Sequence, residues 1–210
     1  LGGAIAGIAI WVVGAGRRLR PGYRAMRQLL ALARPSSDDP RWLVVESAHA
    51  FAVTAGLVRP QVLVSSRLLE TLRPAEVATV VWHEQAHRRR RDGLRLFAAD
   101  FLARLHLPAT RHVLVQQLRL AVEQACDEIA AHQSGDRLQV ADTILRLTRL
   151  VAASRAIPAP VGAAFTGADT VRRVEGLLRP ALQPRSGLGA AGVGVTALLI
   201  ALGVLTSDWW

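Results

Sequence analysis

The positive charges of this chain are confined to its middle. All 26 basic residues are arginines, and they lie between Arg17 and Arg185. Residues 1–16 carry no charged side chain, and residues 187–206 form a second uncharged, apolar stretch. An α-helix needs about 20 such residues to cross the hydrocarbon core of a bilayer. The pattern therefore predicts two membrane-spanning ends around a polar middle.

Both apolar stretches have flanks that are typical of membrane spans. Arginines cluster on the side of each stretch that faces the middle of the chain, namely Arg17, Arg18, Arg20, Arg24 and Arg27 after the first and Arg172, Arg173, Arg179 and Arg185 before the second. Basic residues favour the cytoplasmic side of a membrane, so we expect residues 17–186 to form a cytoplasmic domain. Trp209 and Trp210 follow the second stretch, where an aromatic belt is expected.

These features predict a multi-pass protein of the cell membrane, plasma or inner, with the lipid bilayer as a partner. Because the chain starts inside the first apolar stretch, we expect residues 1–16 to be a transmembrane helix that is truncated at its N-terminus. The alternative for each stretch is a helix buried in a protein core, and for residues 1–16 also the core of a signal peptide, which the position of the arginines after the apolar run disfavours. The net charge of +10 also suits a nucleic-acid-binding protein, but few aromatic residues and charge-free ends disfavour direct contact with nucleic acid.

The polar middle combines short strands with longer helices. Val-rich segments predict strands over residues 42–46, 51–54 and 61–65. After Pro74, a residue favoured at the first position of a helix, the pattern becomes helical. The expected helices cover residues 75–92, up to an interruption at Gly93, and then residues 94–106, 109–133, 137–154 and 169–179. The sequence therefore predicts an α+β fold that is mostly helical and has a small β-sheet.

A metal-binding motif lies within the first long helix. His83, Glu84 and His87 fit the pattern HExxH. Positions i and i+4 lie on one face of a helix, so both imidazoles can bind a single Zn²⁺, and the glutamate can accept a proton from a water that the ion activates. The motif predicts a zinc peptidase with Glu84 as the catalytic base. The alternative is a surface helix with two solvated histidines, which the preceding Val80-Val81-Trp82 run disfavours.

A catalytic zinc needs a third protein ligand beside an open position. Glu123 and Asp127 form a second pair at i and i+4, on a later predicted helix. Spacing alone does not select Glu123 as the ligand. Other acids lie within reach of the motif, namely Asp92, Asp100, Glu128 and Asp136.

Two segments together resemble a known family. VVWHEQAHRRRRDGL and VEQACDEIAA are similar to the membrane metallopeptidases of the BlaR/MecR signal-transducer type, which carry HExxH, a basic run ending in Asp, and a Glu-x-x-Cys-Asp-Glu box. The resemblance covers about residues 42–206. It implies a zincin-like metallopeptidase domain with one zinc per chain, Glu123 as the third ligand, and Asp127 as the carboxylate that holds a histidine by its other nitrogen. It also implies endopeptidase activity on a cytoplasmic regulatory protein, such as a transcriptional repressor.

Other interpretations stay open at this point. A membrane quality-control peptidase of the HtpX type shares HExxH and the Glu-x-x-x-Asp box, although the RRRRD run and Cys126 favour the signal-transducer type. A non-catalytic membrane scaffold is a third possibility, which the intact Glu84 disfavours. Cys126, the single cysteine, is expected to be a packed thiol, with a role as a metal ligand as the alternative.

Overall fold

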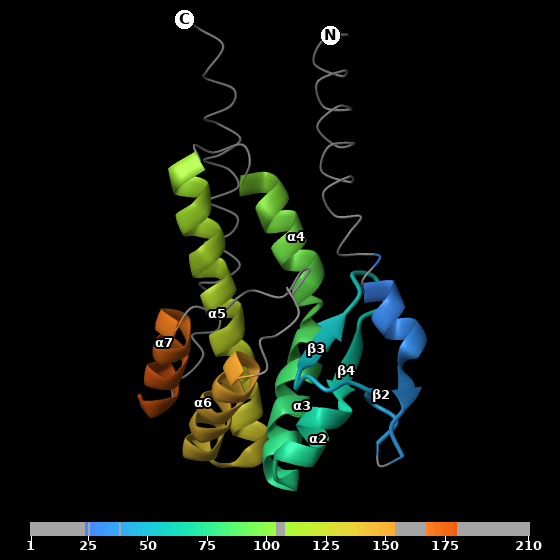
Figure 1. The fold of residues 1–210 in the computed structure, drawn as a ribbon. Coiled ribbons are helices and arrows are strands. Elements are labelled where there is room, and N and C mark those ends of the chain that lie inside the picture. Colours follow the sequence, from blue (N-terminus) through green and yellow to red (C-terminus); the bar gives the residue numbers. More distant parts are fainter. Residues whose placement is uncertain (1–23, 25, 38, 104–107, 154–166, 180–210) are drawn as a thin grey trace, which may run out of the picture. The chain divides into compact units, whose positions relative to one another are not determined.

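The computed structural model describes residues 24, 26–37, 39–103, 108–153 and 167–179 (Figure 1). The two predicted membrane spans, residues 1–16 and 187–206, lie outside these ranges. Within them, no helix has both the length and the apolar character that crossing a membrane requires.

Four strands form one small mixed sheet. They are β1 (Arg34–Pro35), β2 (Leu43–Val45), β3 (Ala52–Ala55) and β4 (Gln61–Ser65), arranged in the order β1-β2-β4-β3. The central β4 pairs in parallel with β2 and antiparallel with β3. The three predicted strands are present. The short β1 was not predicted, because two residues that pair only with β2 leave no periodic pattern.

The remaining elements are helices, which confirms the predicted α+β, mostly helical fold. They are α2 (Ser66–Thr71), α3 (Pro74–Arg90), α4 (Asp92–Ala103), α5 (Pro108–Ser134), α6 (Arg137–Ala153) and α7 (Gly167–Leu178). Residues 26–32, ahead of β1, are also helical. In Figure 1, α3 lies between the sheet and α5, and it contacts both.

The sheet is buried on both faces, which fixes the position of α3. Successive side chains of a strand point to opposite faces. Val62 and Val64 of β4 pack with Val80 and Val81 of α3, whereas Leu63 packs on the other face against the helix over residues 26–32. Val80 and Val81, which precede the HExxH motif in α3, therefore pack against the sheet, whereas Trp82 packs against buried side chains of α5, α6 and α7.

The end of α3 differs from the prediction. The expected interruption at Gly93 is wrong, since α3 ends at Arg90 and Gly93 lies inside α4. Arg91 adopts the left-handed conformation, with φ 54° and ψ 44°, and its amide donates a hydrogen bond to the carbonyl oxygen of Arg88. This turn brings Asp92 back towards α3. The helix therefore ends before a residue in the left-handed conformation, and Gly93 does not interrupt it.

A second core joins the last three helices. Buried side chains of α5, α6 and α7 pack together, namely Ala130, Ala131, Val140, Ala141, Ile144 and Leu177. Arg137 of α6 also donates hydrogen bonds to the carbonyl oxygens of Leu177 (2.8 Å) and Gly176 (3.1 Å) near the end of α7. These contacts hold α7 against the helix that carries Glu123.

Candidate metal centre

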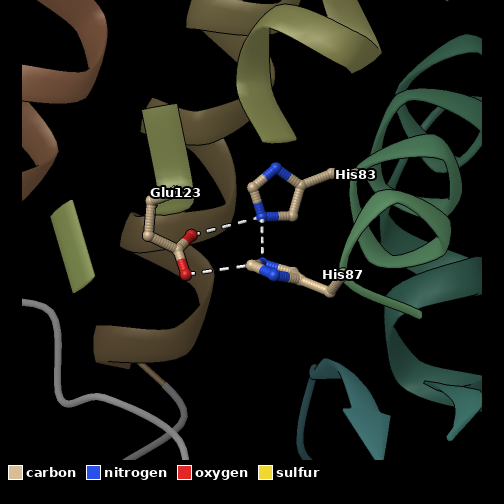
Figure 2. Close-up of side chains that lie close together, drawn as sticks. All are labelled: His83, His87 and Glu123. Carbon is tan, nitrogen blue, oxygen red and sulfur yellow. Dashed lines mark hydrogen bonds and ion pairs between the residues drawn. The ribbon is translucent and has the colours of Figure 1, made fainter. Parts of the chain in front are cut away.

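Three side chains from two helices converge on one point. Figure 2 shows His83 and His87, one helical turn apart on α3, facing the carboxylate of Glu123 on α5. The two Nε2 atoms lie 3.1 Å apart. Nε2 of His83 is 3.2 Å from Oε2 of Glu123, and Nε2 of His87 is 3.4 Å from Oε1. The three side chains offer ligand atoms that all lie within 4.8 Å of one another.

This geometry fits a single tetrahedral ion. Two nitrogens that are each 2.0–2.1 Å from one tetrahedral zinc are separated by about 3.3 Å. The two Nε2 atoms are 3.1 Å apart, and each lies 3.2 or 3.4 Å from one oxygen of the Glu123 carboxylate. All three distances are close to this value. Two imidazoles and one carboxylate are also a ligand set of catalytic zinc sites, which keep a fourth position open. The donor set and its spacing therefore suit Zn²⁺.

A carboxylate holds the second ring nitrogen of each histidine. Nδ1 of His83 lies 2.9 Å from Oδ1 of Asp127, and Nδ1 of His87 lies 3.1 Å from Oδ2 of Asp92. An Nδ1–H that donates to a carboxylate leaves the lone pair of Nε2 free for a metal. Both rings are thereby oriented with Nε2 towards Glu123. Asp127 lies where the resemblance implied, whereas the position of Asp92 was not predicted.

The centre is buried, and its charges compensate one another. Burial favours the neutral imidazole of His83, but hydrogen bonds with Asp127 and Glu123 outweigh burial and raise the pKa of His83. For His87, burial is likewise outweighed by hydrogen bonds with Asp92, Cys126 and Glu123 and by the nearby charge of Glu84, which together raise the pKa of His87. Burial opposes ionisation of Glu123, but its bonds with both histidines keep the pKa of Glu123 well below its usual range. A metal ion that binds here takes the place of protons on the imidazoles.

An arginine from α7 completes the cluster. Nε and Nη2 of Arg173 donate to the two carboxylate oxygens of Asp127, at 2.8 and 2.7 Å, and Nη1 lies 3.3 Å from Oε2 of Glu123. Sequence reasoning missed this residue. Helical spacing could have indicated that Arg173 is turned towards the protein interior, because it lies on the same helix face as Thr170 and Leu177. Both of these residues are buried, whereas Arg172 is exposed.

Glu84 is attached to the sheet. Oγ1 of Thr54, in β3, lies 2.7 Å from both the carbonyl oxygen and Oε2 of Glu84. A hydroxyl has one proton, so it donates to one of these oxygens at a time. This contact holds the carboxylate of Glu84 against β3.

Besides Asp92, the other acids that spacing had left open lie elsewhere. Asp100 pairs with Arg111, and Glu128 pairs with Arg137. Asp136 accepts hydrogen bonds from the amides of Leu138 and Gln139 at the start of α6. Of the five acids considered, the structure brings only Glu123 against both Nε2 atoms.

Cys126 is a packed thiol, as expected. It is fully buried, and its Sγ lies 3.4 Å from Nδ1 of His87 and 3.5 Å from Oδ2 of Asp92. These three residues are a second group with ligand atoms close together. Asp92 already engages Nδ1 of His87, and burial raises the pKa of the thiol, which favours its neutral form over the thiolate that binds metals.

Comparison with known proteins agrees with this centre. A search of curated proteins finds no match to the chain. The sequence model of the family described as BlaR1 peptidase M56, however, matches residues 17–177, a range that contains the sheet and the whole metal centre. The predicted resemblance to this family is thereby confirmed, and the chain belongs to the M56 peptidases of the BlaR1 type.

Proposed function

We propose that this chain is a zinc-dependent endopeptidase. His83, His87 and Glu123 would bind one zinc ion per chain, and Glu84 would act as the catalytic base. The observation that carries the proposal is the convergence of two Nε2 atoms and one carboxylate at 3.1–3.4 Å from one another. Family membership supports peptide-bond hydrolysis as the reaction.

The residues of the chain have separate tasks in this reaction. Zinc, when bound, polarises the scissile carbonyl and lowers the pKa of water at the open position. When the hydroxyl of Thr54 donates to Oε2 of Glu84, Oε1 stays free to take a proton from the attacking water and to return it to the leaving amine. Asp127 and Asp92 keep the two imidazoles in the orientation that metal binding requires.

The edge of the sheet offers a place for the peptide. In the described sheet β3 is an outer strand, and through Thr54 it touches the residue proposed as the base. An extended peptide can add to such an edge through main-chain hydrogen bonds. This arrangement would bring a backbone carbonyl of the substrate close to the centre, as an endopeptidase requires.

The proposed setting is the cytoplasmic face of a cell membrane. The support is the charge-free stretches over residues 1–16 and 187–206 and the arginines that flank them on the inner side. The proposed substrate is a cytoplasmic regulatory protein, such as a transcriptional repressor. Its support is the resemblance to signal transducers of the BlaR/MecR type.

Zinc stoichiometry tests the ligands and the base together. We expect one zinc per chain in the full chain purified in detergent, loss of zinc in Glu123→Ala, and retention of zinc in Glu84→Gln. The exposed Glu70→Ala is the matched control, and it should retain zinc. Cleavage of fluorescein-labelled casein should occur with the wild type and be absent in Glu84→Gln. A wild type that binds no zinc, or a Glu123→Ala variant that keeps it, would contradict the assignment.

A further inference from the structure

The helix α7 contributes the side chain of Arg173 to the metal centre. The Arg173 side chain is only 11% exposed, although its neighbour Arg172 is exposed to solvent. It reaches two carboxylates that belong to a different helix, α5. Nothing in the proposed reaction uses this residue directly.

We infer that Arg173 is a positioning residue that makes docking of α7 a condition for tight metal binding. The inference rests on the proposed function, because it concerns the same centre. Arg173 would act through Asp127 and Glu123, by fixing both carboxylates in the orientation that the two histidines and the metal need.

The contacts of Asp127 show how this positioning works. The guanidinium of Arg173 donates bidentate hydrogen bonds to the two carboxylate oxygens of Asp127, at 2.8 and 2.7 Å. Oδ1 also lies 2.9 Å from Nδ1 of His83. Because a bidentate pair fixes the plane of a carboxylate, rotation of Asp127 would break contacts with both partners. The orientation of the His83 ring therefore depends on Arg173.

Arg173 also contacts one carboxylate oxygen of Glu123. Oε2 of Glu123 lies 3.3 Å from Nη1 of Arg173 and 3.2 Å from Nε2 of His83. The guanidinium therefore limits rotation of the carboxylate whose oxygens face the histidines. A lysine ammonium lacks the planar fork that lets one side chain serve both acids.

Burial gives the arginine a second role. Asp127 and Glu123 are 1% and 8% exposed, so their charges are largely removed from water. An unpaired buried carboxylate is costly, and a guanidinium stays charged at all physiological pH values. Arg173 thus keeps two carboxylates together and in place before a metal arrives, which is preorganisation of the centre.

The coupling must operate in both directions. Contacts outside the centre dock α7, including the bond from Nε2 of Gln124 to the carbonyl oxygen of Arg172 (3.1 Å) and the bonds from Arg137 to Leu177 and Gly176. If docking of α7 strengthens metal binding, metal binding strengthens docking of α7 by the same factor. Any partner that displaces α7 would then weaken the hold on zinc.

Zinc affinity of the full chain in detergent tests the first half of the inference. Competition with a chelator should show that Arg173→Met weakens zinc binding about 10–100-fold, the usual range for residues that orient metal ligands. The matched control is the neighbouring Arg172→Met, which should bind zinc like the wild type. Arg173→Lys should lie between the wild type and Arg173→Met, and it serves as the test variant if Arg173→Met does not fold.

Two further readouts separate positioning from a general loss of stability. In a double-mutant cycle, Asp127→Asn and Arg173→Met should be clearly non-additive in zinc affinity, because one acts through the other. Zinc should slow hydrogen exchange of the α7 amides in the wild type, and Arg173→Met should abolish this zinc-dependent part. The absorption spectrum of the Co²⁺-loaded protein should change in Arg173→Met and not in Arg172→Met.

The outcomes also separate the inference from the proposed function. One zinc per wild-type chain with equal affinity in Arg173→Met would overturn the inference and leave the proposed function standing. Additive effects in the cycle, or α7 protection that zinc does not alter, would also overturn it. Absence of zinc binding in the wild type would overturn the proposed function together with the inference.

Discussion

The carboxylate of Asp92 lies 3.1 Å from Nδ1 of His87, across the break between α3 and α4. This pair mirrors the contact of Asp127 with Nδ1 of His83, at 2.9 Å. The two histidines of the motif therefore each have a carboxylate behind them, one from the start of the next helix and one from α5. Arg91, the last arginine of the basic run that follows the motif, forms the turn that brings Asp92 into place.

The contact between His87 and Asp92 predicts that removing the charge of Asp92 weakens zinc binding without abolishing it. In Asp92→Asn the amide oxygen can still accept a hydrogen bond from Nδ1, but the negative charge that strengthens His87 as a ligand is lost. We expect zinc affinity to fall about 10-fold, the lower end of the range for such contacts. Chelator competition measures this. The control is Asp100→Asn, also on α4, whose partner is Arg111; an equal loss in the control would refute the prediction.

The contact of Thr54 with Glu84 predicts an effect on catalysis without an effect on metal content. Thr54→Val keeps the shape of the side chain and removes the hydroxyl that lies 2.7 Å from Oε2 of Glu84. A general base contributes about 10²–10⁴-fold, so a base that is present but poorly held should lower kcat by about 10-fold. Casein cleavage and zinc stoichiometry together check this. Thr71→Val removes a hydroxyl that bonds within α2, and it should change neither quantity.

The parts of the fold that were predicted from the sequence are those with local signals. Pro74 marks the start of α3, and the Val-rich segments match β2, β3 and β4. The end of α3 is set by the left-handed conformation of Arg91, and β1 depends on pairing with β2. Neither the end of α3 nor β1 leaves a periodic pattern in the sequence, so neither could be predicted from the sequence alone.

The residues of the candidate site were likewise predicted from the sequence only where the signal is local. His83 and His87 follow from the i, i+4 spacing on one helix, because helix geometry alone brings them together. Glu123 lies on another helix, so spacing left five acids open and only the family resemblance selected one. Arg173 lies on a third helix, and pattern alone does not reveal which acid a buried arginine meets in the folded chain.

Burial of Cys126 predicts that its thiol is protected and is dispensable for metal binding. It is fully buried between His87 and Asp92. We expect no alkylation by iodoacetamide in the folded chain, complete alkylation in denaturant, and one zinc per chain in Cys126→Ala. Mass spectrometry and metal analysis measure these. Loss of zinc in Cys126→Ala, while the circular dichroism stays unchanged, would instead make the thiol a ligand.

The capping of α3 predicts a pH-dependent contribution to stability from Glu76. This carboxylate is 1% exposed, accepts a hydrogen bond from the backbone N–H of Arg73 (2.7 Å), and pairs with the side chains of Arg73 and Arg146. The Arg73 side chain, opposed by burial, keeps the pKa of Glu76 below its usual value. Stabilisation is therefore complete above the unfolded pKa of about 4.3 and is lost as the pH falls through the folded pKa.

The matched test compares two glutamates that differ in burial. Glu76→Gln should lower the free energy of unfolding by about 1.5–3 kcal/mol at pH 7, the range for hydrogen bonds to charged groups. Glu70, whose side chain is 64% exposed and pairs with Arg67, should give almost no change as Glu70→Gln. Urea unfolding followed by circular dichroism measures both. The deficit of Glu76→Gln should shrink as the pH is lowered below about 4, because wild-type Glu76 then becomes protonated and loses its own advantage. A deficit that stays constant down to low pH would show that Glu76 stabilises α3 by packing and not by its charge.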